Sequence, residues 1–224
     1  STRSFIQALA WFLNNEAQAK AWIKDLVDNK ARILDTKDRN IFEKRFIALM
    51  NGPEDIYADI LAKLFNTTHS GQRLRVLNLI GSKGELALQV GEAAPFGLIN
   101  IGDSPSLYAM CEEDESFDYQ RDDFAKTLFH TLNDKDSKLH ILIGSRKFTE
   151  GWSSWRVSTM GLLNMGRGEG SQIIQLFGRG VRLKGRDYSL KRSTPGQRPK
   201  GIHLEKLETL NISKTKGLPL VMKY

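Results

Sequence analysis

The strongest constraint on the fold is a change in the spacing of apolar residues near residue 70. Before this point, apolar side chains recur every three or four residues, and after it they alternate with polar residues over short runs. The first spacing is typical of amphipathic helices and the second of half-buried strands. The sequence therefore predicts a helical segment over residues 1–68, followed by a domain over residues 69–224 that contains a sheet.

Three helices are expected in the first segment. One covers residues 5–27, and a second covers 41–50 and stops before Asn51-Gly52-Pro53, which breaks helices. A third covers 53–65 and has Pro53 in its first turn, where proline is tolerated. The aromatic residues of this segment, Trp11, Phe12 and Trp22, are expected to belong to the core rather than to a ligand site.

Strand and helix patterns then follow one another. Residues 73–80 and 85–90 alternate around a glycine-containing turn and predict a hairpin. A short strand over 96–101 precedes a helix that Asp103 or Ser104 would cap. Further elements are expected as follows: a helix with Phe124, Leu128 and Leu132 on one side, a buried strand over 139–143, an apolar run over 157–164 and a helix over 171–183. This order predicts an α/β fold in which helices cover a sheet with parallel pairs.

Composition excludes several classes of protein. The chain has no apolar run of about 18 residues, so no membrane span is expected. Its single cysteine, Cys111, excludes an internal disulfide, and a cytoplasmic protein is the expectation. The four histidines lack metal-ligand spacing, so no metal site is predicted. Because the chain starts without methionine, we expect it to be part of a larger protein.

The charge is positive and unevenly distributed. Lys and Arg number 33 against 26 acidic residues, which gives a net charge of +7. Residues 179–200 contain eight basic residues and one acid, whereas 112–123 contain seven acids and one arginine. A basic C-terminal third favours a polyanionic partner. A basic loop that is merely solvated would have the same composition.

Residues suited to phosphate chemistry occur in two clusters. None of the 19 glycines is followed by lysine, so the chain has no P-loop and is not expected to hydrolyse ATP alone. One cluster, residues 145–151, follows the strand expected over 139–143. The other contains Arg179 and Arg182 at a spacing that places both guanidinium groups on one helix face. Such a pair suits a triphosphate, although it would also suit a surface salt-bridge network.

These clusters resemble the last two motifs of superfamily-two helicases and translocases. The relevant residues are Gln175, Gly178, Arg179 and Arg182 in one motif and Ser145 to Gly151 in the other. The wider sequence around them is most similar to the helicase (Res) subunit of type III restriction enzymes. The resemblance implies a RecA-like, mostly parallel sheet flanked by helices. Residues 69–224 would be the second RecA-like domain, without the domain that carries the P-loop.

The resemblance also implies roles for individual residues. Arg179 and Arg182 would be arginine fingers, and Gln175 would orient them, which makes these three the catalytic residues. The residues expected near the nucleotide are Glu150, Gly151 and Gly178. Those expected on the nucleic-acid backbone are Ser104, Ser145, Arg146 and Lys147. Ser153 stands where many relatives have an aspartate that would contact the ribose.

The function implied is that of the C-terminal ATPase lobe of an ATP-dependent DNA helicase or translocase. ATP with Mg²⁺ would be bound by the complete protein and not by this chain alone. The implied partners are the DNA backbone, the first RecA-like domain of the same polypeptide, and a methyltransferase or specificity subunit. Backbone contacts carry little sequence information, so DNA binding is expected to be non-specific and sensitive to salt.

Two other readings use different residues. In the first, the chain is a non-catalytic nucleic-acid-binding module that depends on the basic loop over 184–200. In the second, it is another phosphate-binding α/β enzyme that uses the glycine string over 166–170. That string lacks the spacing of a dinucleotide-binding fingerprint.

Overall fold

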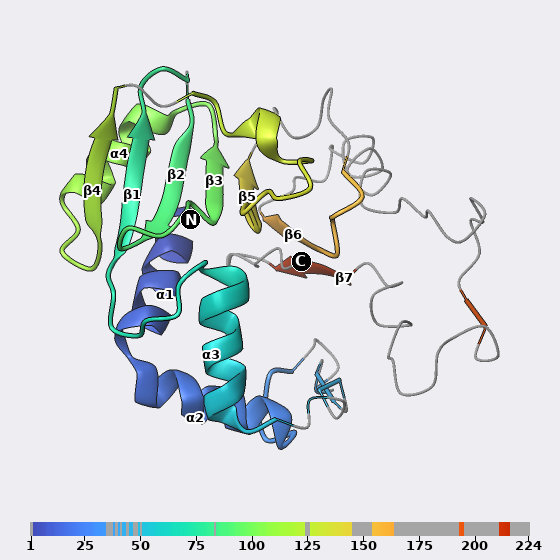
Figure 1. Cartoon of the computed structure of the whole chain (residues 1–224). Coiled ribbons are helices and arrows are strands. Elements are labelled where there is room, and N and C mark those ends of the chain that lie inside the picture. Colours follow the sequence, from blue (N-terminus) through green and yellow to red (C-terminus); the bar gives the residue numbers. More distant parts are fainter. Residues whose placement is uncertain are drawn as a thin grey trace.

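Figure 1 shows the computed structural model of the chain. The structure describes residues 2–34, 51–82, 84–123, 126–144, 154–163 and 211–215, together with residues 38, 40, 42, 43, 45, 46, 49, 193 and 194. Most of the residues in helices and strands belong to one sheet and to the helices packed against it.

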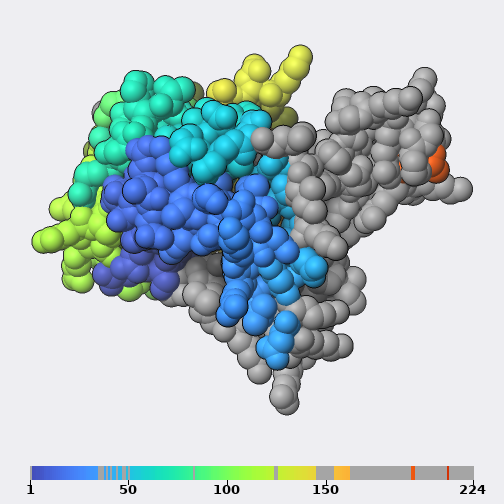
Figure 2. Space-filling view, turned by 90° about the horizontal axis from the view of Figure 1, so that it is seen from below, coloured from blue at the N-terminus to red at the C-terminus, as the bar shows by residue number. Residues whose placement is uncertain are grey.

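The first segment forms three helices. They are α1 (Thr2–Asn14), α2 (Glu16–Val27) and α3 (Pro53–Leu64). The helix expected over 5–27 is broken at Asn15, whose side-chain amide donates to the carbonyl oxygen of Trp11 at 2.8 Å. Trp11 and Trp22 stack across this corner with ring centroids 4.3 Å apart. In the view from below, α1, α2 and α3 lie together at the front of the described part of the chain (Figure 2).

Two expected helices differ from the structure. Within the span 41–50, Phe42, Glu43, Arg45 and Phe46 lie in turns, and the amide of Arg45 bonds to the carbonyl of Phe42 at 3.0 Å. The helix expected around Leu128 and Leu132 is only a short 3-10 helix, η1 (Phe129–Thr131). The helix after residue 103 forms as α4 (Ser104–Glu112), and Asp103 is its cap.

The main sheet has five strands in the order β4-β1-β2-β3-β5. Their bounds are β1 (Leu74–Leu79), β2 (Leu86–Val90), β3 (Gly97–Asn100), β4 (Asp118–Asp122) and β5 (Ile141–Gly144). β1 is parallel to β4, and β3 is parallel to β5. β2 is antiparallel to both of its neighbours, so it alone runs against the other four strands. The expected hairpin is confirmed, and the sheet is mixed.

Apolar residues are buried on both faces of the sheet. One cluster joins α1, α3 and α4 to the sheet and includes Ile6, Phe65, Leu74, Leu88 and Ile141. The cluster on the other face includes Leu77, Leu98, Leu132 and Leu142, so the segment around η1 packs there. Alternate residues of β1 and β5 belong to different clusters, as strand geometry requires. The described part is therefore an α/β fold in which the α-helices and one face of the sheet share a core.

A separate two-stranded sheet pairs β6 (Thr159–Leu163) with β7 (Asn211–Thr215) in parallel. The amide of Asn211 bonds to the carbonyl of Ser158 at 2.9 Å at the start of this pairing. The apolar run expected over 157–164 thus contains a strand, and its partner comes from near the end of the chain.

Candidate functional site

Four strands of the main sheet end at the same edge. Because β2 is antiparallel to both β1 and β3, the parallel strands β4, β1, β3 and β5 all point in one direction (Figure 1). In register, Asn100 at the end of β3 pairs with Gly144 at the end of β5. Ligands of open α/β sheets bind outside the carboxyl ends of parallel strands. The candidate site therefore lies at this edge of the sheet.

The turn between β1 and β2 lies at the same edge. The amide of Ser82 bonds to the carbonyl of Leu79 at 2.9 Å, and the amide of Glu85 bonds to the carbonyl of Ser82 at 3.1 Å. Gly84 has a φ of +80°, which side chains disfavour. The Ser82 hydroxyl is buried and has no hydrogen-bond partner. This tight turn thus leaves a polar group unsatisfied beside the ends of the parallel strands.

A buried carboxylate holds the turn against the next segment. Glu85 is 2% exposed. It accepts hydrogen bonds from the Thr127 hydroxyl at 2.8 Å and from the amide of Leu128 at 3.2 Å. A buried carboxylate needs such donors because its desolvation is costly. Glu85 therefore fixes the position of the turn, and its role is structural.

The connection from β3 to α4 contributes the start of a helix. Gly102 has a φ of +84°, which lets the chain turn sharply after β3. The Asp103 carboxylate accepts the amide hydrogen of Ser106 at 3.3 Å and caps α4. Pro105 occupies the first turn, where its missing N–H is not needed. Ser104 is buried at the first position of the helix.

Asn100 and Ser104 form a notch with Gly84. Each of the two side chains is 6% exposed, and neither forms a hydrogen bond with another residue that the structure describes. A Cβ atom at Gly84 would lie 3.7 Å from Ser104 Oγ and 3.8 Å from Asn100 Nδ2. The amide and the hydroxyl thus point into the space that this glycine leaves open. We call Gly84, Asn100 and Ser104 the edge notch.

Ser104 is the one predicted site residue within the described part, and it lies at this edge. The other predicted residues fall outside the described residues: Ser145, Arg146, Lys147, Glu150, Gly151, Gln175, Gly178, Arg179 and Arg182. The first of them, Ser145, directly follows Gly144 at the end of β5. Sequence reasoning missed Asn100 and Gly84. An asparagine inside the apolar run 96–101 was the signal for the first.

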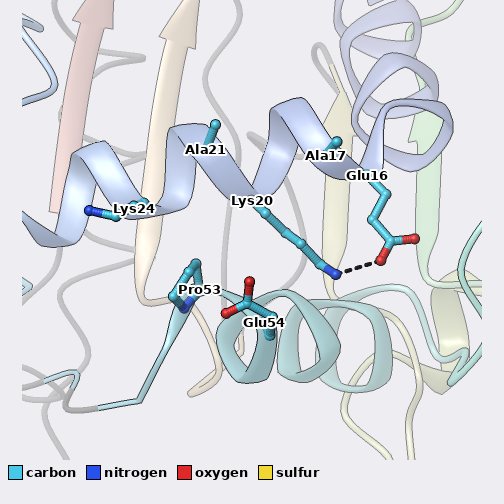
Figure 3. A pocket seen from close by; sticks show the side chains of 7 residues that line it. All are labelled: Glu16, Ala17, Lys20, Ala21, Lys24, Pro53 and Glu54. Atoms are coloured by element: carbon cyan, nitrogen blue, oxygen red, sulfur yellow. Dashed lines mark ion pairs between the residues drawn. The ribbon is translucent and has the colours of Figure 1, made fainter.

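A second depression lies between α2 and α3 (Figure 3). This groove has a volume of about 590 Å³, and its lining includes Glu16, Lys20, Lys24 and Glu54. Lys20 and Glu16 point toward α3, and their charged atoms meet at 2.6 Å. Lys20 Nζ also lies 5.5 Å from the ring centroid of Tyr57. The acidic and basic side chains of this groove balance in charge. The groove therefore belongs to the packing of α2 against α3, and the Lys20–Glu16 ion pair lies across it.

Other site types are not found in the described part of the chain. Within it, His, Cys, Asp and Glu side chains form no group of three or more that could hold a metal ion. A search of the same residues finds no helix with the length and hydrophobicity needed to span a membrane. The edge of the main sheet therefore remains the candidate site.

Comparisons of the chain with protein families, with curated proteins and with solved structures found no match.

Proposed function

We propose that this chain is the C-terminal ATPase lobe of an ATP-dependent DNA helicase or translocase that resembles a type III restriction Res subunit. The observation that carries the proposal is the common edge of the sheet. Ser104 starts α4 there, and β5 ends there at Gly144, immediately before the motif that begins at Ser145. The start of α4 at Ser104 and the end of β5 at Gly144 thus lie at one edge of the sheet.

The sheet supports this proposal in general form. Parallel pairs such as β3–β5, covered by helices on a face, are what a RecA-like lobe requires. The reversed strand β2 departs from an all-parallel RecA-like sheet. β2 lies in the middle of the sheet between β1 and β3, and the turn with Gly84 precedes it.

The proposed mechanism divides the work between two lobes. ATP with Mg²⁺, bound on a P-loop elsewhere in the polypeptide, would supply the free energy for movement. Arg179 and Arg182 keep their positive charge at neutral pH, so they suit the negative charge that develops during phosphoryl transfer. Residues at the sheet edge hold the DNA backbone, and closure of the lobes shifts one set of backbone contacts relative to the other.

The test is the substitution Arg179→Ala in the polypeptide that carries both lobes. We expect DNA-stimulated ATP turnover to fall by about a thousandfold, because an arginine finger contributes at least that much. DNA affinity at two salt concentrations should change little. Arg186→Ala, in the same basic stretch, is the matched control and should keep its turnover. Unchanged turnover in Arg179→Ala would refute the proposal.

The excess of positive charge favours one other candidate function. Residues 179–200 hold eight basic residues and one acid, which is enough for non-specific binding of nucleic acid. A non-catalytic module would lose DNA affinity equally in Arg179→Ala and Arg186→Ala. The same pair of variants therefore separates the two candidates.

A further inference from the structure

The edge notch has the features of a binding site that is built but empty of protein groups. Buried polar atoms are costly unless they are hydrogen-bonded, and native proteins leave few of them unsatisfied. Asn100 and Ser104 are each 6% exposed and lack a hydrogen-bond partner among the described residues. Their polar atoms still reach solvent and so are open to a ligand, because the fully buried unpartnered side-chain atoms of the described part belong to Tyr57 and Ser82. Two such groups converge on one space, and the Ser82 hydroxyl in the adjacent turn is also unpartnered.

We propose that the edge notch binds a phosphate group through the Asn100 amide and the Ser104 hydroxyl. Both groups are hydrogen-bond donors, and asparagine and serine commonly contact phosphate oxygens. Because Gly84 has no Cβ, no side chain of this turn residue stands between these donors and a ligand. The start of α4, which has nine residues, adds a partial positive charge on the same side.

Two carboxylates adjoin the notch residues in the sequence, and neither is hydrogen-bonded to these donors. Glu85, which follows Gly84, accepts hydrogen bonds from the Thr127 hydroxyl at 2.8 Å and from the amide of Leu128 at 3.2 Å. The Asp103 carboxylate accepts the amide hydrogen of Ser106 at 3.3 Å and is not bonded to either notch residue. The notch therefore favours an anion held by neutral donors, with the start of α4 as a weaker contributor.

The inference deepens the proposed function and rests on it for the source of the phosphate. Under that function, the phosphate belongs to the DNA backbone. The notch adds Asn100 and the β1–β2 turn to the contact surface, neither of which the helicase motifs include. A free nucleotide or inorganic phosphate would offer the same chemistry, so the test must separate these sources.

The first experiment measures binding of a fluorescent single-stranded oligonucleotide to the whole chain. Asn100→Ala and Ser104→Ala should each raise the Kd by about tenfold, because each removes a hydrogen bond to a charged group. The slope of log Kd against log salt should stay unchanged, since neutral donors release no counterions. Gln18→Ala, an exposed amide on α2, is the matched control and should bind as the wild type does.

The second experiment follows the Asn100 side-chain amide by NMR during titration with the oligonucleotide, with ATP and with inorganic phosphate. We expect its signals to shift most with the oligonucleotide. If phosphate or ATP shifts these signals while the wild type binds no oligonucleotide, the phosphate site stands and the DNA-binding function is refuted.

The opposite result would separate the two proposals in the other direction. In this result the wild type and Asn100→Ala bind DNA equally well, and DNA does not shift the Asn100 signals. Phosphate binding at the edge notch is then refuted, and the proposed function stands. Misfolding is controlled by thermal unfolding. Asn100→Ala should change the Tm by less than about 2 °C, because the amide has no hydrogen-bond partner to lose among the residues that the structure describes.

Discussion

At the scale of single residues, Asp114 joins the first helix to the end of α4. Its carboxylate accepts hydrogen bonds from Arg3 Nη2 at 3.1 Å, from Gln7 Nε2 at 2.8 Å and from the amide of Ser116 at 3.1 Å. The Ser116 hydroxyl, its amide, Gln7 and Arg3 together lower the pKa of Asp114 from 3.8 to about 2. The charged form is thus favoured in the folded protein.

Asp114→Asn should therefore destabilise the fold at neutral pH. We expect the free energy of unfolding to fall by about 2 kcal/mol, which is the value of a pKa shift of this size. Urea unfolding at pH 7 measures it. Asp25→Asn, at an exposed position of α2, serves as the control. Equal stability of the two variants would show that the Asp114 contacts contribute nothing.

At the scale of elements, Arg156 fastens the segment before β6 to the loop that leads into β5. Its guanidinium donates to the carbonyl oxygens of Leu132 at 2.8 Å and Leu139 at 3.0 Å. A third bond reaches the carbonyl of Ser137 at 3.4 Å. Two residues separate Arg156 from the start of β6, so these bonds hold the start of the second sheet against the loop before β5.

Arg156→Ala should release this connection. We expect a loss of about 2 kcal/mol, because carbonyl groups lose hydrogen bonds from a charged donor. Amide hydrogen exchange should accelerate in β6 more than in β1, since the released contacts lie next to β6. Arg156→Lys should be intermediate, and Arg32→Ala, at an exposed position, should match the wild type. Uniform acceleration across both sheets would contradict a local role.

At the scale of the whole molecule, His140 connects three segments. Its Nε2 lies 3.1 Å from Asn66 Oδ1, and Asn66 Nδ2 donates to the carbonyls of Ala94 at 3.1 Å and Lys138 at 3.0 Å. Burial lowers the pKa of His140 from 6.5, and the nearby charges of Arg156 and Lys138 lower it further. The folded protein therefore takes up this proton less readily than the unfolded chain.

Stability should consequently fall in two steps as the pH falls. Below pH 6.5 the unfolded chain binds the His140 proton before the folded protein does, so stability decreases from there downward. The second loss occurs between the unfolded and folded pKa values of Asp114, 3.8 and about 2. Thermal unfolding across the pH range measures both steps. His140→Gln should remove the upper step, whereas His69→Gln, at an exposed histidine, should retain it.

Local patterns predicted those elements that bury apolar side chains in a regular way. The hairpin of β1 and β2, the helix α3 and the cap of α4 at Asp103 follow from alternation, from Pro53 and from Asp103-Ser104-Pro105. β4 was missed because it is an edge strand that exposes Tyr119, Gln120 and Arg121. Its pairing with β1 uses the backbone, which leaves no apolar signal in the sequence.

The short helix after β4 was overestimated for a related reason. Leu128 and Leu132 have helical spacing, but the Glu85 carboxylate accepts hydrogen bonds from the Thr127 hydroxyl and the Leu128 amide. Leu132 and the partly buried Leu128 then pack on the second face of the sheet around a 3-10 turn. A tertiary hydrogen bond from a distant residue thus outweighed local helix propensity.

The sequence by itself determined the α/β class, the helical start, the hairpin and the position of Ser104 at a helix start. These depend on spacing and on capping residues, which act over a few neighbours. Only the tertiary structure decided that β2 runs against the other four strands and that Gly84 lies beside Asn100 and Ser104. Pairing between distant strands brings these residues together, and no local pattern encodes which strand ends become neighbours.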